Sequence, residues 1–388
     1  MNTILARHLT PLAALLAGIA HGGTASAETH YRLANLASLG GTSSTAKSIN
    51  DAGWISGRSN LTGGQSRHAT LWRGNALTDL GTLGGPNSSV VWPIKNKRGI
   101  VSGIAQTGMP QPLGENWSCA PFFAAATRYG YQCLGFRWRD GVMTALPTLG
   151  GTNGYAAGTN NLGQTVGWAE NTVRDPTCVA PQVLQFRAVL WDASGHAHEL
   201  PPRAGDSVSA ATAVNDRGQV VGISGVCDVA VGERSAIHAV LWQDGQSVDL
   251  GNIGGDAWNT PTSINAYGDI VGFANITAGD ALNEHAFLWT RASGIRDLGT
   301  LPGDTTSDAN GINNLGQIVG DSCASDGSCR GFVWRDGVML DVQPLIVSGD
   351  DDTIITVNDI DDSGRIVGQA IDNATGAFVA FEAIPTSD

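Results

Sequence analysis

One short turn, Asn-x-x-Gly, constrains the fold of this 388-residue chain more than any other feature, because it recurs along almost the whole sequence. Successive copies start 46, 64, 55, 50, 48 and 48 residues apart. A repeat near 48 residues, lengthened twice by insertions, indicates a solenoid, an array or a propeller built from similar units. The first positions of the turns are Asn50, Asn96, Asn160, Asn215, Asn265, Asn313 and Asp361.

Each copy contains four short runs with the character of strands. In the fifth copy, Asp269–Gly272 follows the turn, His285–Trp289 comes third, and Ile295–Leu298 ends the unit. Runs rich in β-branched and aromatic residues, bounded by turn residues, predict strands and not helices. The 52 glycines suit a fold with many tight turns. The third run carries an aromatic residue in every copy: Trp72, Trp138, Trp191, Trp242, Trp289, Trp334 and Phe381.

Seven units of four strands predict an all-β fold, a seven-bladed β-propeller. The seventh copy supplies only three strands, while Tyr31–Leu36 supplies a spare one. Pairing this N-terminal strand beside the last strand of copy seven would close the ring and leave no open edge. We therefore expect one propeller over residues 28–388, with blades at about 39–81, 82–147, 148–201, 202–251, 252–299, 300–345, and 346–384 together with 28–38.

The repeated positions are interpreted as scaffold. The Asn of the turn can bond the backbone two residues on, and its Gly accepts the positive φ of a bulged hairpin end. The tryptophans are expected in the core between sheets. His68, His238 and His285 share one position before the Trp, which favours a structural role. The run Asp359–Gly364 also resembles a calcium loop, so calcium is the one cofactor kept as an alternative.

The chain is acidic, with a formal net charge of −13. Nucleic-acid binding needs basic surface that displaces counterions from phosphate, so this class is excluded. Residues 1–27 have the pattern of an export signal: Arg7, the apolar run Leu9–Ala20, and small residues at Ala25 and Ala27. The apolar run is too short to span a bilayer. We expect a secreted, extracellular or periplasmic, soluble monomer without a membrane span.

Six cysteines in an exported chain predict disulfide bonds. All of them fall in insertions between second and third strands, at about 104–134, 169–185, 223–237 and 321–330. Zinc is disfavoured, because no His lies near the closest cysteine pair. The expected pairs are Cys119–Cys133 and Cys323–Cys329, each within one loop, and Cys178–Cys227 between adjacent copies.

The copies resemble the HAF repeat of secreted bacterial proteins, which is named for a tripeptide found here as His285-Ala286-Phe287. The Asp-Leu-Gly-x-Leu-Gly-Gly segment is complete at Asp79–Gly85, whereas Asp297–Gly303 departs from it at Pro302. The resemblance covers nearly all of residues 31–382, and copies two and seven fit it worst. Members are extracellular and generally lack assigned chemistry, so the resemblance implies location and architecture more than function.

Long loops gathered on one face of a rigid scaffold are the usual place for recognition. In a propeller the insertion-bearing loops and the connections between blades share one face, and the Asn-x-x-Gly turns lie on the other. The copy-two loop is crowded with aromatic residues, which would form either a small core around its disulfide or a platform for sugar rings or an apolar partner. The candidates are Trp117, Tyr129 and Tyr131 in this loop, and Trp92, Tyr155 and Trp258 near the blade entries.

An acidic residue follows the exit glycine in copies four to seven but not in copies one to three. If these loops ring the central opening, one arc of it is acidic. Clustered carboxylates could bind a cation or raise one carboxyl's pKa for acid–base chemistry, and simple loop capping is the alternative. The residues are Asp206, Asp256, Asp304 and Asp350.

No catalytic motif stands out: the sequence has no Gly-x-Ser-x-Gly, no Cys–His pair, no His-rich metal spacing and no phosphate loop. We therefore expect a binding or interaction module for an extracellular glycan or protein, acting through the loop-bearing face. A polysaccharide hydrolase or lyase with its site on the same face is the alternative, and a structural surface component is the third.

Overall fold

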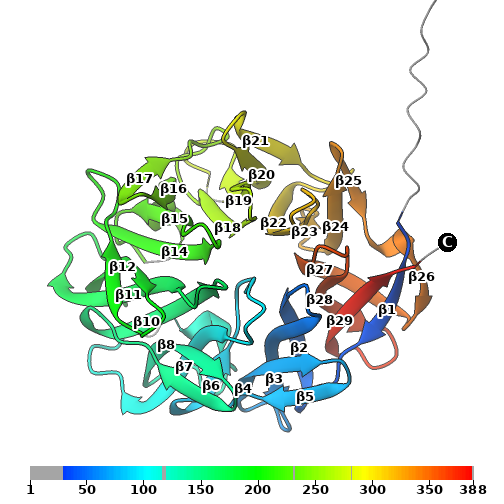
Figure 1. Cartoon of the computed structure of the whole chain (residues 1–388), viewed down its shortest axis with the longest axis horizontal. Coiled ribbons are helices and arrows are strands. Elements are labelled where there is room, and N and C mark those ends of the chain that lie inside the picture. The colour runs from blue at the N-terminus through cyan, green and yellow to red at the C-terminus, as the bar shows by residue number, and fades with distance from the viewer. Residues whose placement is uncertain (1–28, 116–118, 230–231, 281, 387–388) are drawn as a thin grey trace, which may run out of the picture.

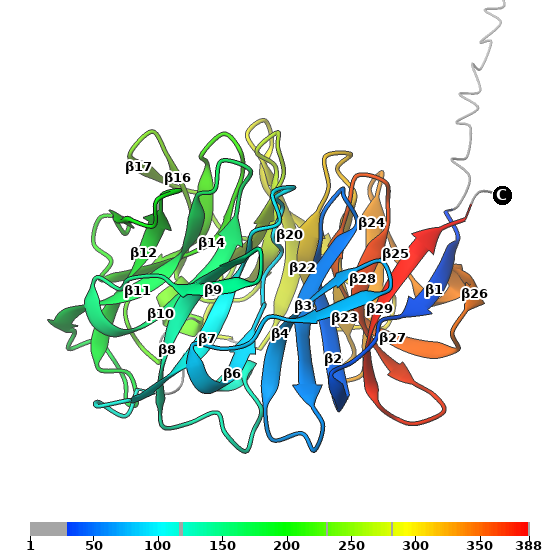
Figure 2. The same ribbon diagram turned by 60° about the horizontal axis from the view of Figure 1, so that its bottom comes forward.

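The computed structural model describes residues 29–115, 119–229, 232–280 and 282–386, so the expected export signal lies outside the described residues. Strands dominate this part of the chain, and they form sheets that stand side by side around a central axis (Figure 1). Figure 2 shows the strands running between two faces where the connecting loops gather. Three short 3-10 turns occur, η1 (Ala120–Phe122), η2 (Glu233–Ala236) and η3 (Gln343–Leu345). The all-β, propeller-like prediction is confirmed.

Five of the sheets have four strands each, and every strand pairs with the next one along the chain. The first strand of each sheet, such as β14 or β18, lies nearest the axis (Figure 1). The first two sheets are β6 (Gly84–Ser89), β7 (Val101–Pro110), β8 (Tyr131–Arg139), β9 (Val142–Ala145), and β10 (Gly150–Thr159), β11 (Thr165–Arg174), β12 (Leu184–Trp191), β13 (Ala197–Leu200). The next three are β14 (Val208–Val214), β15 (Val220–Gly225), β16 (His238–Gln243), β17 (Gln246–Asp249); β18 (Thr260–Ile264), β19 (Ile270–Asn275), β20 (Glu284–Thr290), β21 (Gly294–Gly299); and β22 (Thr306–Ile312), β23 (Ile318–Cys323), β24 (Cys329–Arg335), β25 (Val338–Asp341).

The remaining strands form one nine-stranded sheet, in the order β26-β1-β29-β2-β3-β4-β5, with β28 also on β29 and β27 on β28. It contains two antiparallel four-stranded runs, β2–β5 and β27–β28–β29–β1. A single parallel residue pair, Ser43 and Phe378, connects the two runs. The bounds are β1 (Tyr31–Asn35), β2 (Gly40–Ile49), β3 (Trp54–Leu61), β4 (Arg67–Arg73), β5 (Ala76–Asp79), β26 (Ile346–Gly349), β27 (Asp352–Ile360), β28 (Ile366–Asp372) and β29 (Phe378–Pro385).

The N-terminal strand β1 lies antiparallel to β29, with Tyr31 opposite Pro385 and Asn35 opposite Phe381 (Figure 1). This is the pairing predicted from the sequence. Strand β26 was not predicted, and it pairs in parallel with the other side of β1. The N-terminal strand is therefore covered on both of its edges, which removes a template for unwanted strand pairing.

Neighbouring sheets pack through apolar clusters that contain the repeated tryptophans. Trp72 is 2% exposed and packs with Ile55 of its own four-stranded run and with Val367 and Ala380 of the neighbouring one. The indole N–H groups are also used, since Trp72 donates to the carbonyl of Ala37 at 2.8 Å and Trp191 does the same toward Pro147 at 2.9 Å. The tryptophans are core residues, as predicted.

The Asn-x-x-Gly turns connect the sheets at one end of the axis, which we call the turn end. The Oδ1 of Asn215 accepts hydrogen bonds from the backbone N–H groups of Arg217 and Gln219, at 3.0 and 3.1 Å. Its Nδ2 donates to the carbonyl of Asn265 in the next sheet, at 3.1 Å. The same bond to the next sheet is made by Asn50, Asn96, Asn160, Asn265 and Asn313. The local capping role is confirmed, and the link between sheets is an additional one.

The insertions lie between second and third strands, at the end opposite the turns, which we call the loop end. Two strands run further than predicted: β7 continues to Pro110 and β11 to Arg174, although loops were expected from about residues 104 and 169. The reason is that the ladder continues into the insertion, where Pro110 lies opposite Tyr131. All three predicted disulfides form, and Cys178–Cys227 joins the insertions of two neighbouring sheets.

Across the described ranges, no helix is long and apolar enough to cross a membrane.

Candidate functional site

A pair of positions recurs from sheet to sheet around the central axis, and we call the region that these positions surround the channel. One position lies on the first strand of a sheet, and the other lies directly opposite on the second strand. Three such pairs line one common cavity: Tyr155 with Trp168, Ala210 with Ile223, and Thr260 with Phe273. Since the strand register is the same in each sheet, these pairs lie at one level of the channel.

This cavity, which we call the aromatic cavity, has a volume of about 140 Å³. The rings of Tyr155 and Trp168 are stacked at 2° with centroids 6.3 Å apart, and Phe122 lies 5.6 Å from Tyr155. An apolar cavity of about 150 Å³ accepts a benzene-sized molecule, so the space suits one ring. The lining residues are Trp92, Phe122, Tyr155, Trp168, Ala210, Ala211, Thr212, Ile223, Trp258, Thr260 and Phe273.

Connecting segments complete the cavity. Phe122 belongs to η1 within the Cys119–Cys133 loop, and its carbonyl accepts a hydrogen bond from Arg67 Nη1 at 3.3 Å. Trp92 lies between β6 and β7. The copy-two insertion therefore folds inward over the channel, and its disulfide holds an aromatic side chain against the wall.

Trp258 is held by the insertion that contains η2. Its backbone N–H donates to the carbonyl of Glu233 at 3.1 Å. A Cβ on Gly232 would lie 2.3 Å from the Trp258 ring, so only glycine fits beneath this side chain. Trp258 also has a φ of 52°, a left-handed conformation that costs a bulky residue about 1–3 kcal/mol. Such local strain is typical of functional positions.

Two polar atoms in the cavity wall lack partners. The Tyr155 hydroxyl and the Trp258 Nε1 are buried, and neither makes a hydrogen bond within the part of the chain that the structure describes. A buried polar group left without a partner costs about 1–3 kcal/mol. Burial raises the pKa of Tyr155 well above its usual value, so its hydroxyl keeps its proton. Both atoms belong to residues that line the cavity, so they are the candidate donors to a bound molecule.

The same level of the channel is polar in three other four-stranded runs, whereas the β6–β7 pair is Ser89 with Ile104. The equivalent pairs are Asp308 with Asp321, Thr356 with Gln369, and Thr45 with Arg58. Burial, followed by the charge of Asp321, raises the pKa of Asp308 well above its usual value. Burial lowers the pKa of Lys47 to about 7 and that of Arg58 to about 10. The channel therefore has an aromatic arc and a charged arc at one level.

The turn end holds a second hollow, of about 170 Å³ and polar. Its groups satisfy one another: Lys97 pairs with Asp51 at 2.9 Å, and Asn161 donates to Asp216 at 2.7 Å. Asn314 bonds Asp362 in the same way, also at 2.7 Å. Because these polar groups are already paired, the turn end is better explained as scaffold than as a binding site.

The structure sorts the aromatic candidates into two groups. Trp92, Tyr155 and Trp258 come together in the aromatic cavity. Tyr129 and Tyr131 lie apart from it on the surface, 54% and 37% exposed. The sixth aromatic candidate, Trp117, lies outside the described residues.

The four acidic candidates lie in loops where each has a partner in place. Asp206 contacts His238 at 2.9 Å and Asp304 pairs with Arg330 at 2.9 Å. The other two accept backbone N–H groups, with Asp256 bonded to Gly279 and Asp350 to Asn35, at 2.9 and 2.8 Å. None of the four lines the aromatic cavity. These contacts favour the loop-capping interpretation, and a ligand role for these residues stays a prediction.

The repeated histidines are also paired. His68 and His285 contact Asp79 and Asp297 through Nδ1, at 2.8 and 3.0 Å, and His238 contacts Asp206. A position that pairs with a carboxylate in three sheets supports the structural interpretation.

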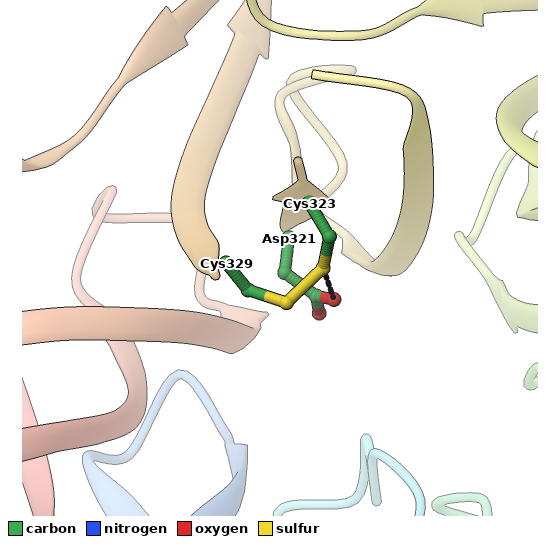
Figure 3. Close-up of side chains that lie close together, drawn as sticks. All are labelled: Asp321, Cys323 and Cys329. Atoms are coloured by element: carbon green, nitrogen blue, oxygen red, sulfur yellow. Dashed lines mark hydrogen bonds between the residues drawn. A yellow bond between two sulfur atoms is a disulfide. The ribbon is translucent and has the colours of Figure 1, made fainter. Parts of the chain in front are cut away.

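One cluster has the spacing of a metal site: Asp321, Cys323 and Cys329 (Figure 3). The two sulfurs are bonded to each other, so neither is a thiolate that could ligate a metal. Figure 3 shows Cys323 beside the Asp321 carboxylate, with Sγ 3.9 Å from Oδ2. In the run Asp359–Gly364, which resembles a calcium loop, Asp361 forms an ion pair with Arg365 at 2.6 Å and Asp359 forms one with Lys95. The donors there are committed to protein cations.

Several residues of the site were missed by the sequence interpretation. They share one column of the repeat, the eighth residue after the first position of each turn, and this column was visible in the aligned copies. Its channel-facing character depends on strand register, which the copies alone did not reveal. The column reads Arg58, Ile104, Trp168, Ile223, Phe273, Asp321 and Gln369.

Comparisons with known proteins support the fold. The β-propeller domain of the Trilobed protease from Pyrococcus furiosus matches with a TM-score of 0.52 and 8% identity, over 92% of this chain and 98% of that domain. This likeness shows a β-propeller fold. A streptogramin B lyase structure matches over 92% of this chain and 98% of its own, with 10% identity and a TM-score of 0.49.

An acylaminoacyl peptidase from Pyrococcus horikoshii matches with a TM-score of 0.49 and 10% identity over 93% of this chain. The present chain spans about half of that peptidase, 52% of its length. No family model matches the sequence, and no curated protein matches it.

Proposed function

We propose that this protein is a secreted binding module that receives one ring of an extracellular ligand in the aromatic cavity at the loop end of its channel. The observation that carries the proposal is the cavity itself: ring-sized, lined by six aromatic side chains, and holding two buried donors without partners. Ligand sites are typically apolar hollows with a few placed polar groups.

The architecture proposed for this module is a seven-bladed propeller of the HAF-repeat kind. The nine-stranded sheet then counts as two blades, because its two four-stranded runs share only one pair of the β-ladder and otherwise pack side by side like separate sheets. Three disulfides are compatible with an extracellular or periplasmic location.

The ligand classes are an extracellular glycan or protein that presents a terminal ring. A volume of about 140 Å³ admits one ring, so a polymer would enter by its end or by a single side chain. A sugar ring would stack on Tyr155, Trp168 or Trp258, while an aromatic side chain would gain mainly from apolar burial.

Binding should be measured by calorimetry against a panel of methyl glycosides, oligosaccharides, phenol and indole. We expect at least one ring compound to bind, and Trp258→Ala to weaken its binding by about tenfold or more. Trp54→Ala is the matched control, because Trp54 is stacked under Arg73 at 3.8 Å and does not line the cavity. Equal binding by wild type and W258A would contradict the proposal.

A hydrolase or lyase acting on an extracellular polymer is the second candidate. Asp308 and Asp321 lie directly opposite each other, and burial raises the pKa of both. A carboxyl that holds its proton near neutral pH can serve as a general acid. Turnover of a glycan that is lost in Asp308→Asn, with ring binding unchanged, would favour this candidate.

A further inference from the structure

Arg58 is a cation placed at the level of the aromatic cavity. Arg58 is on β3 and lies opposite Thr45 of β2. Trp168 of β11 occupies the same register position, opposite Tyr155 of β10. Arg58 is within electrostatic reach of Tyr155, because each side chain affects the ionisation of the other. Tyr155 lines the cavity and Arg58 does not, so Arg58 lies beside the cavity, within electrostatic reach of its wall.

Arg58 differs from the other cations around it in having no partner. Arg67 donates to Asn60 at 2.8 Å and to the carbonyl of Phe122 at 3.3 Å. Lys47 donates to Asn358 at 2.8 Å. The Arg58 guanidinium makes no hydrogen bond or ion pair with any residue in the described ranges.

The surroundings of Arg58 do not neutralise it. After burial, the charge of Arg67 lowers the pKa of Arg58 further because it has the same sign, and Tyr155 acts in the opposite direction. The carboxylate of Asp321 acts on Lys47 instead. The Arg58 side chain is partly buried, which disfavours its charged form, and no ion pair with a described residue offsets that effect. A bound anion would supply the negative charge that the protein does not pair with Arg58.

We propose that the ligand of this channel is a small ring-bearing carboxylate, with its ring in the aromatic cavity and its carboxylate on Arg58. The inference rests on the proposed function and specifies the ligand's charge. Guanidinium and carboxylate form paired, parallel hydrogen bonds, which fix orientation as well as charge. The donors Tyr155 and Trp258 remain available for a second oxygen on the ring.

The test is calorimetric titration of the disulfide-intact protein with benzoate, phenylacetate and 3-phenylpropanoate. These probes differ only in the length between ring and carboxylate. Each is compared with its uncharged amide, with acetate, and with benzylamine as a cationic ring. Comparing the affinities of glucuronate and methyl glucoside tests whether an acidic sugar supplies the ring and the carboxylate.

We expect at least one ring carboxylate to bind ten times or more tightly than its amide, and acetate to bind far more weakly. Arg58→Met should remove that advantage while amide binding stays unchanged. Arg217→Met is the matched control, because Arg217 is exposed at the turn end, and it should bind like wild type. Arg58→Gln serves as a second variant should the Met variant fold poorly.

Thermal unfolding supplies an independent readout. Arg58 is partly exposed and makes no hydrogen bond or ion pair with the described residues, so R58M should melt at or above the wild-type temperature while binding the carboxylate less well. A purely structural Arg58 would instead lower the melting temperature on substitution.

The outcomes separate the two proposals. Equal affinity for carboxylate and amide, an unchanged preference in R58M, or tighter binding of benzylamine would overturn the charge assignment and leave the ring-binding proposal in place. Failure of every ring compound to bind the wild-type protein would overturn both.

Discussion

The two ends of the central channel are built from the same repeat but differ in how their polar groups are used. At the turn end, amides, carboxylates and backbone groups bond one another from sheet to sheet, as Asn161 does with Asp216 and Asn215 with Asn265. At the loop end, the Tyr155 hydroxyl, the Trp258 Nε1 and the Arg58 guanidinium are among the groups that have no partner within the described residues. The difference indicates that the repeated sequence supplies the scaffold and the divergent positions supply the site.

The same contrast appears around the circumference of the channel. One column of the repeat holds Trp168, Ile223 and Phe273 on one arc and Arg58, Asp321 and Gln369 on the other. A scaffold needs only that these positions fit their space. Because apolar residues lie on one side of the channel and charged residues on the other, the lining can orient a ligand that carries both a ring and a charge.

The largest expected effect comes from the disulfide that joins two loop-end insertions. Replacing Cys178 and Cys227 together by Ser should destabilise the protein by about 4 kcal/mol, because the bond spans 49 residues. The Cys323–Cys329 bond spans 6 residues and should be worth about 2 kcal/mol. Chemical denaturation of the two double variants measures both losses of unfolding free energy. An equal loss in the two would remove the loop-length explanation.

The turn end can be broken without touching the loop end. Asn265→Ala removes the acceptor for two backbone N–H groups and the bond to Asn313, so we expect a loss of about 2–3 kcal/mol. Tyr267→Ala in the same turn is the control, since Tyr267 is 66% exposed. Urea unfolding gives both values. Ring binding should be unchanged in N265A, and its loss would mean that the two ends are not independent.

The loop end can be perturbed through one hydrogen-to-methyl change. Gly232→Ala places a Cβ against the Trp258 ring, so the ring must move and ligand binding should weaken severalfold. A double-mutant cycle with Trp258→Ala tests whether Gly232→Ala acts through the Trp258 ring. If it does, G232A should cause almost no further loss of ligand binding in the W258A background. Additive losses would show that Gly232 acts elsewhere.

The smallest effect concerns a scaffold pair outside both ends. The hydrogen bond that the His285 ring donates to Asp297 raises the pKa of His285 above its usual value. The pair therefore stabilises the fold below the unfolded pKa of about 6.5, and this contribution is lost as pH rises through the folded pKa. His285→Gln should cost less than about 1 kcal/mol at pH 5 and nothing at pH 9. A loss that grows with pH would contradict the assigned pair.

Much of the architecture was predictable, because the repeat records it directly. The turns, the tryptophan core, the disulfide pairs and the pairing of the N-terminal strand with the last sheet all follow from aligned copies. Strand β26 was missed, since it pairs in parallel beyond the repeat unit. The ends of β7 and β11 were placed too early, because hydrogen bonding across the ladder does not depend on a hydrophobic pattern.

The site was predictable only in part. Trp92, Tyr155 and Trp258 stood out as aromatic residues near the blade entries, and they meet in the cavity. Trp168, Phe273 and Arg58 were passed over because a second-strand residue faces the channel only if the register places it there. Phe122 reaches the cavity because its loop folds inward, which composition cannot show.

The most direct test is a crystal structure of the protein soaked with 3-phenylpropanoate. We expect density for the ring between Trp168 and Trp258, with the carboxylate within hydrogen-bonding distance of the Arg58 guanidinium. Ring density beside the exposed Tyr129 and Tyr131, or at the turn end, with the aromatic cavity unchanged, would contradict it.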